Sequence, residues 1–148
     1  MHLVHLAIGP DCITSALLDW SDTEKYIQGS SRDKRLEGLF ESYRTWCERE
    51  NVTDRASRKL FTVQILKPEG WKFVEVSQKI LNATSCRYML FWFCGIAKLF
   101  AEMHNSNEDM RLANINHVFL FECLVHNHLK ANQFVGNNCG YGKSQVVK

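Results

Sequence analysis

The C-terminal end of the sequence carries residue types that bind nucleoside phosphates. Gly140, Gly142, Lys143 and Ser144 lie within five consecutive residues. Glycines in such a string let backbone N–H groups wrap phosphate oxygens, while the lysine meets the terminal phosphates and the hydroxyl ligates magnesium. The sequence therefore contains a candidate nucleotide-binding site.

This string resembles a Walker A loop, whose pattern is G-x-x-x-x-G-K-[ST], but it departs from that pattern. Asn137 occupies the position of the first glycine, and Gly136 comes one residue too early. A working loop also follows a strand, and Phe134–Val135 makes a poor one. We therefore expect residues 135–148 to form a flexible tail. The alternative is an N-terminal fragment of a mobile-element helicase or ATPase, truncated in a degenerate Walker A loop.

A second candidate is a basic stretch in the first half of the chain. Apolar spacing predicts a helix from Ser31 to Glu50, and Thr53 is the expected N-cap of a second helix from Asp54 to about Leu66. The two could form a helix-turn-helix-like unit over residues 31–66 that binds nucleic acid. The cations expected to contact phosphates are Arg49, Arg55, Arg58, Lys59 and Lys67.

The string Tyr43–Arg44–Thr45–Trp46–Cys47, with the basic segment after it, is loosely similar to helical modules of mobile-element proteins, such as the arm-type domains of tyrosine recombinases. The resemblance implies DNA binding, and it covers only the part of the chain from Ser31 to Leu66. Helix pairs with a basic surface also occur in unrelated folds. An ordinary solvated face is therefore the alternative interpretation of the same residues.

Cysteine and histidine spacing does not indicate a metal site. Cys123, His126 and His128 lie within six residues, but on a helix only the first two share a face, and structural zinc sites favour close cysteine pairs on turns. We expect no metal, no cofactor and no catalytic residue, because the common hydrolase and kinase motifs are absent. The six cysteines are widely spaced and no signal peptide precedes them, so we expect reduced thiols and an intracellular location, nuclear or cytoplasmic.

The hydrophobic pattern predicts an all-α fold. Asp11 is the expected N-cap of a first helix through Trp20. The stretch from Ser77 to His104 reads as a long central helix capped by Ser77, and a last helix should run from Asn107 to about Asn132. We expect one domain over residues 1–134, an irregular bundle of about five helices. A short extended segment near residues 71–76 is an additional expectation.

Composition narrows the function only slightly. The chain is 45% hydrophobic and 23% charged, with a net charge of +2, which is too small to predict a polyanionic partner. The longest charge-free apolar run, Tyr88–Ala97, is about half of a membrane span. The apolar stretch Tyr88–Phe100 could leave surplus surface for another protein chain or domain. We favour a non-enzymatic interaction module; an open reading frame without activity of its own is a further alternative.

Overall fold

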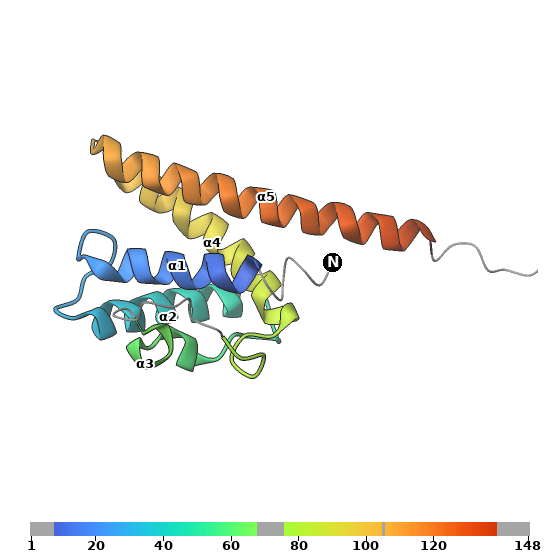
Figure 1. Cartoon of the computed structure of the whole chain (residues 1–148), viewed down its shortest axis with the longest axis horizontal. Helices are drawn as coiled ribbons and strands as arrows, with labels where there is room; N and C mark the ends of the chain where they lie inside the picture. Colours follow the sequence, from blue (N-terminus) through green and yellow to red (C-terminus); the bar gives the residue numbers. More distant parts are fainter. Residues whose placement is uncertain (1–7, 68–75, 105, 139–148) are drawn as a thin grey trace, which may run out of the picture.

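The chain folds as an irregular all-α bundle (Figure 1). The computed structural model describes residues 8–67, 76–104 and 106–138, with side chains as far as His126. Within these ranges there is no strand, which confirms the predicted fold class. The elements are α1 (Gly9–Asp22), α2 (Arg32–Arg49), the 3-10 helix η2 (Arg58–Phe61), α3 (Val63–Leu66), α4 (Ala83–Met103) and α5 (Glu108–Asn138).

Helix α1 starts earlier than the sequence suggested. Gly9 is its first residue and Pro10 lies in the first turn, where a missing N–H costs nothing. Asp11 is therefore not the N-cap, and the prediction is wrong; its carboxylate lies in the first turn, near the positive end of the helix dipole. The apolar positions predicted for this helix, among them Leu17 and Trp20, are fully buried.

Helix α2 agrees with its prediction at both ends. Ser31 caps the N-terminus with its side-chain oxygen. At the C-terminus Asn51 adopts a left-handed φ of 53°. Its N–H donates to the carbonyl of Glu48, and the N–H of Val52 donates to the carbonyl of Cys47 at 2.9 Å. This pair of hydrogen bonds is a Schellman motif, which ends the helix and turns the chain sharply.

The second helix of the predicted helix-turn-helix-like unit does not form as one element, so that prediction is wrong. After α2 the backbone donates hydrogen bonds outward: the N–H of Ala56 to the hydroxyl of Tyr43 and the N–H of Ser57 to the carbonyl of Ile80, both at 3.0 Å. These bonds replace those that a helix would make within itself. Thr62 is extended, with ψ of 145°, and separates η2 from α3.

Helix α4 begins later than predicted. Its N-cap is Asn82, whose Oδ1 accepts the N–H of Ser85 at 2.8 Å. Ser77, the predicted cap, lies in a turn before the helix, where its carbonyl accepts the N–H of Ile80. The extended segment expected near residues 71–76 lies outside the described residues, except for Val76, which belongs to no helix or strand.

Helix α5 begins where it was predicted to begin. Asn107 caps it, since its Oδ1 accepts the N–H of Met110 at 3.2 Å. It continues to Asn138, so residues 135–138, expected in the tail, are helical. The glycine-rich string follows directly, and its residues Gly140, Gly142, Lys143 and Ser144 lie outside the described residues. The segment that leads into the string is thus a helix, whereas a Walker A loop follows a strand.

The core lies where α1, α2 and α4 meet. Trp20 of α1 is fully buried and stacks on Phe93 of α4, with ring centroids 5.0 Å apart. Phe100, two turns further along α4, packs edge-to-face against the same indole. α4 and α5 form a helical hairpin, and α5 lies along the outside of the bundle and extends past it (Figure 1).

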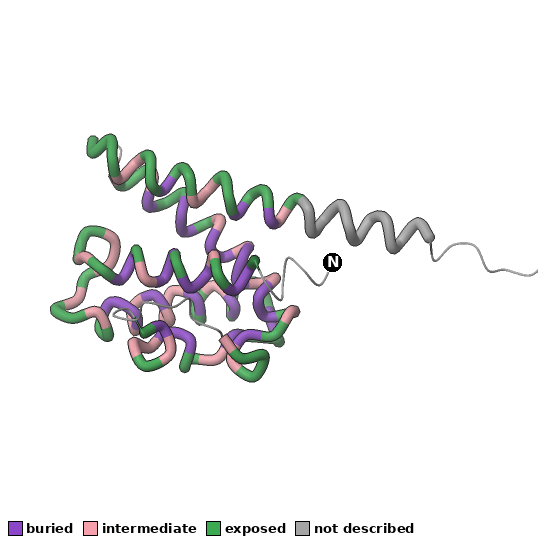
Figure 2. Tube along the Cα trace, viewed as in Figure 1, coloured by how far each residue is buried: buried purple, intermediate pink, exposed green. Residues whose placement is uncertain are grey.

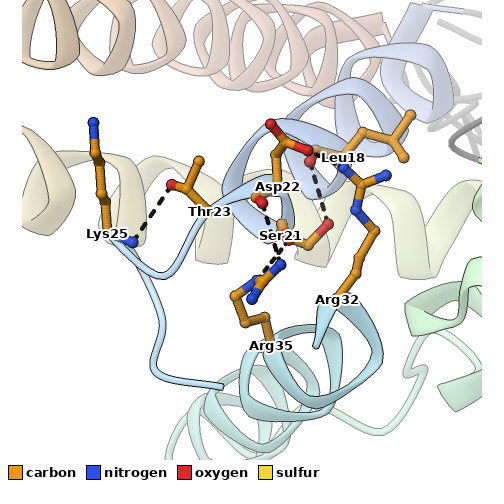
Figure 3. Close-up of polar contacts among 7 residues, drawn as sticks. All are labelled: Leu18, Ser21, Asp22, Thr23, Lys25, Arg32 and Arg35. Atoms are coloured by element: carbon orange, nitrogen blue, oxygen red, sulfur yellow. Dashed lines mark hydrogen bonds and ion pairs between the residues drawn. The ribbon is translucent and has the colours of Figure 1, made fainter. Parts of the chain in front are cut away.

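Arg35 joins α2 to the end of α1 through hydrogen bonds and is not available to a ligand. Arg35 is 9% exposed and donates to three backbone carbonyls, those of Ser21 at 2.7 Å, Gly29 at 2.7 Å and Asp22 at 3.1 Å (Figure 3). Two of these carbonyls belong to the last turn of α1, where the helix dipole favours a cation. Arg32 pairs with the side chain of Asp22 beside it.

Candidate interaction surface

The five cations proposed for nucleic-acid binding are exposed, but three of them are paired with glutamates. Arg58 donates to Glu37 at 2.9 Å, and Arg49 donates to Glu50 at 2.9 Å. Arg55 lies 3.9 Å from Glu48. A phosphate backbone approaching this face would also meet these carboxylates. The charge pattern is therefore that of a mixed solvated surface.

The remaining two predicted cations do not lie on a shared helix face. Lys59 belongs to the 3-10 helix η2, and Lys67 ends α3 in a left-handed conformation with φ of 44°. Because no continuous helix joins them, the spacing that suggested a row of phosphate contacts does not exist. The geometry does not favour the nucleic-acid interpretation.

A hollow of about 420 Å³ lies between the end of α1 and the first half of α5. Its ionisable lining consists of Asp19, Asp22, Lys25, Tyr26, Arg32 and His117. Four of these groups lie in pairs: Arg32 pairs with Asp22, and Nε2 of His117 lies 3.5 Å from Asp19. The two pairs leave the hollow with mixed charge and no excess of one sign to select a ligand.

Behind this hollow a buried amide joins α1 to α5. Asn114 of α5 accepts the indole N–H of Trp20 at 3.3 Å and donates to the carbonyl of Met110 at 2.8 Å. Its amide also lies 3.4 Å from the hydroxyl of Tyr26. Asn114 is fully buried, so these hydrogen bonds fix which side of α5 faces the bundle.

The opposite side of α5 is apolar and exposed. Leu112, Ile115 and Phe119 follow i, i+3, i+7 spacing, and on α4 Leu99 and Met103 are exposed one turn apart. We call these five residues the α4–α5 apolar surface. Their exposed fractions run from 40% to 69%, with Phe119 the highest. Figure 2 shows that the outer side of α5 is exposed along the part described and that its buried residues face the bundle.

An ion pair shows on which side of α5 the helix α4 lies. Lys98 of α4 contacts Glu122 of α5 at 2.7 Å. Ile115 precedes Glu122 by two helical turns and therefore lies on the same side of α5 as this ion pair. Leu99 lies roughly 100° around α4 from Lys98, on the side away from α5, so the ion pair lies between the apolar residues of α4 and those of α5. Leu120 is also exposed, at 38%, but it lies roughly 160° around the helix from Glu122 and outside the surface.

The sequence placed surplus apolar surface near Tyr88–Phe100, and most of that stretch is core. Trp92, Phe93 and Phe100 are buried, and within the stretch only Leu99 contributes to the surface. The sequence did contain an indication of the exposed apolar residues of α5, because the predicted last helix has more apolar residues than one helix face can hold. The periodicity alone did not show which of those residues α4 would cover.

The cysteines and histidines considered for metal binding are dispersed. Cys123 and His126 are exposed on α5, and the side chain of His128 lies outside the described part. In that part, His, Cys, Asp and Glu side chains nowhere gather in threes at metal-binding distances. The described cysteines carry free thiols, and burial raises the pKa of the Cys86 thiol to about 12, which suits a core residue and not a nucleophile.

Comparisons with known proteins add no homologue. No protein-family model matches the chain, and no curated protein or solved structure is significantly similar to it. Separately, none of the helices in the described ranges combines the length and apolar character needed to cross a bilayer.

Proposed function

We propose that this chain is a non-enzymatic helical interaction module that binds another protein chain through the α4–α5 apolar surface. The observation that carries the proposal is the exposure of five large apolar side chains on two adjacent helices. Exposed apolar groups of this size are typical of interaction sites, since covering them removes several hundred Å² of apolar area from water.

The composition of the surface supports a protein partner. Phe119 projects as an aromatic anchor of the kind that dominates binding energy at interfaces. Charged groups lie beside the apolar residues: the ion pair of Lys98 and Glu122 between the two helices, and Glu102 near the end of α4. Apolar anchors bordered by charged groups are the usual composition of a protein interface.

Site-specific photocrosslinking of the full chain in its own cells tests the proposal. A benzophenone amino acid at position 119 should form covalent adducts with a protein, which mass spectrometry then identifies. Leu112→Ser on the same chain should reduce the adducts at least about tenfold, because it removes a neighbouring contact worth over 1.4 kcal/mol.

Leu120→Ser is the matched control. It removes a similarly exposed leucine from the same helix, on the side away from α4, and should leave the adducts unchanged. Equal losses with Leu112→Ser and Leu120→Ser, or no adduct at position 119, would contradict the proposal.

A further inference from the structure

Two buried histidine nitrogens lie where the end of α1 and the loop after it meet the α4–α5 hairpin. They are Nδ1 of His117 on α5 and Nε2 of His104, directly after α4, and neither has a hydrogen-bond partner. In the part of the chain whose side chains are described, every other buried side-chain nitrogen or oxygen has one. Because folded proteins pair nearly all such atoms, these two nitrogens require an explanation.

Both histidine rings contact aromatic side chains of the segment that ends α1. His117 meets Trp20 edge-on, with ring centroids 5.7 Å apart, and His104 meets Tyr26 edge-on, with centroids 5.1 Å apart. Asn114 joins the same two aromatic residues, since it accepts the indole N–H of Trp20 and its amide lies 3.4 Å from the Tyr26 hydroxyl. We call Trp20, Tyr26, His104, Asn114 and His117 the histidine cluster.

The histidine cluster accommodates neutral imidazole rings and not charged ones. A protonated histidine carries an N–H on both ring nitrogens and needs an acceptor at each. For His117 the structure supplies the Asp19 carboxylate, 3.5 Å from Nε2, and nothing at Nδ1. For His104 it supplies nothing at Nε2. Protonation would therefore leave a buried charged donor without an acceptor, which disfavours the closed arrangement.

The remaining titratable groups around the cluster do not offset this effect. The hollow beside His117 is also lined, from α1, the loop 23–31 and α2, by Asp22, Lys25, Tyr26 and Arg32. Arg32 already pairs with Asp22, and Lys25 would oppose a second positive charge. The residues of α5 that line the hollow beside His117 are uncharged. His104 forms no ion pair with any described side chain, and the Tyr26 hydroxyl that it faces is neutral in mild acid.

We propose that the histidine cluster is an acid-sensitive switch: when His104 and His117 take up protons, the loop after α1 leaves the hairpin and the contact between α1 and α5 opens. Such an opening can be local, because α5 packs mainly against α4 and meets α1 at few residues. Trp20 also stacks on Phe93 of α4, so the packing of α1 and α2 on α4 remains. The switch does not depend on the α4–α5 apolar surface and adds to the proposed function.

Hydrogen exchange of the Trp20 indole measures the opening, because this N–H is bonded to Asn114 only while the contact is closed. A histidine with an ordinary pKa of about 6.5 in the open form, and neutral in the closed form, raises the open fraction up to about tenfold between about pH 7.5 and about pH 5.5. The protection of this proton in NMR, relative to a free indole at the same pH, should therefore fall about tenfold. Trp20→Phe identifies its signal among the four tryptophans.

Backbone amides in the middle of α2 show whether the opening is local. Leu39 is fully buried there and contributes no side chain to the histidine cluster. Its amide protection should change by less than about twofold over the same pH range, because local opening leaves the rest of the bundle closed.

The double variant His104→Phe/His117→Phe tests the two rings. It keeps aromatic rings that do not titrate, so the protection of the Trp20 indole should no longer depend on pH. His117→Phe alone should remove part of the dependence. His126→Phe is the matched control, because it replaces an exposed histidine of the same helix and should respond to acid like the wild type. Circular dichroism shows whether each variant keeps the wild-type helix content.

Three results would overturn the switch. The first is equal protection of the Trp20 indole at both pH values in the wild-type chain. The second is an equal loss of protection at Leu39, which would mean that acid unfolds the whole bundle. The third is an acid response in a folded double variant, or in His117→Phe if the double variant does not fold, that equals the response of the wild type.

Discussion

The side chain of His117 lies between α1 and α5 in surroundings that disfavour its protonation. Its Nδ1 atom is buried without a hydrogen-bond partner. The ring packs against the edge of Trp20, with centroids 5.7 Å apart, and against Phe121 at 6.2 Å. Burial lowers the pKa of His117 below its ordinary value, and the carboxylate of Asp19 opposes this shift only in part.

The stability of the α1–α5 contact should therefore fall in acid. Because its pKa in the folded chain lies below the ordinary 6.5, His117 binds fewer protons in the folded than in the unfolded chain, and the free energy of unfolding decreases as pH drops through 6.5. His117→Phe keeps an aromatic ring and should flatten this decrease. Urea unfolding at several pH values between neutral and mildly acidic measures it; identical pH slopes for the two proteins would contradict the prediction.

For single residues, the sequence shows which side chains are present but not which groups they contact in the fold. The sequence does not indicate that the nearest charged group of His117 is Asp19, far away along the chain. The exposed Phe119 and the buried Phe121 are two residues apart in the same helix and look alike in a hydrophobic pattern. Only the packing of α4 and α1 against α5 distinguishes them.

At the scale of elements, periodicity predicted the helices better than it predicted their ends. The starts of α2 and α5, at Ser31 and Asn107, were predicted correctly, because each precedes a strong apolar pattern. Thr53 and Ser77 were wrongly predicted as N-caps, because several serines, threonines and asparagines precede each of these segments. Which of them caps the helix depends on backbone geometry that tertiary contacts set, as the hydrogen bond from Ala56 to Tyr43 illustrates.

Replacing each of the two candidate N-caps of α4 by alanine should change the free energy of unfolding by unequal amounts. Asn82→Ala removes the side chain that accepts the N–H of Ser85 and should lower the free energy of unfolding by about 1 kcal/mol. Ser77→Ala leaves the backbone carbonyl that accepts from Ile80 intact and should change it by less than about 0.5 kcal/mol. Urea denaturation of both variants measures the difference; the reverse order would mean that α4 begins at the serine.

For the whole molecule, the sequence predicted the all-α class and left the interaction surface unplaced. The class followed from helical spacing repeated along the chain. The surface could not be placed because it is defined by what the bundle leaves uncovered, and α4 and α5 both have more apolar residues than one face needs. The basic residues illustrate the same limit, since the pairing of Arg58 with Glu37 joins α2 to η2.

Weak binding to polyanions should follow from this distribution of charge. The net charge is +2, and three of the five predicted phosphate-binding cations already face glutamates. We expect no DNA mobility shift at physiological salt, and equal behaviour of the wild type and the Arg55→Gln/Lys59→Gln double variant at low salt. Tight, salt-dependent binding that the double variant loses would contradict this expectation and restore the nucleic-acid hypothesis.

The hydrogen bond between Trp20 and Asn114 has a consequence for the order of folding. It joins residues 94 positions apart, and a contact that closes so long a segment comes at a large entropic cost before it contributes any stability. Helix α5, by contrast, begins only a few residues after α4 ends and can pack against α4 early. The contact of α1 with α5 should therefore form after the α4–α5 hairpin, and the amide of Asn114 then determines which side of α5 is buried against α1.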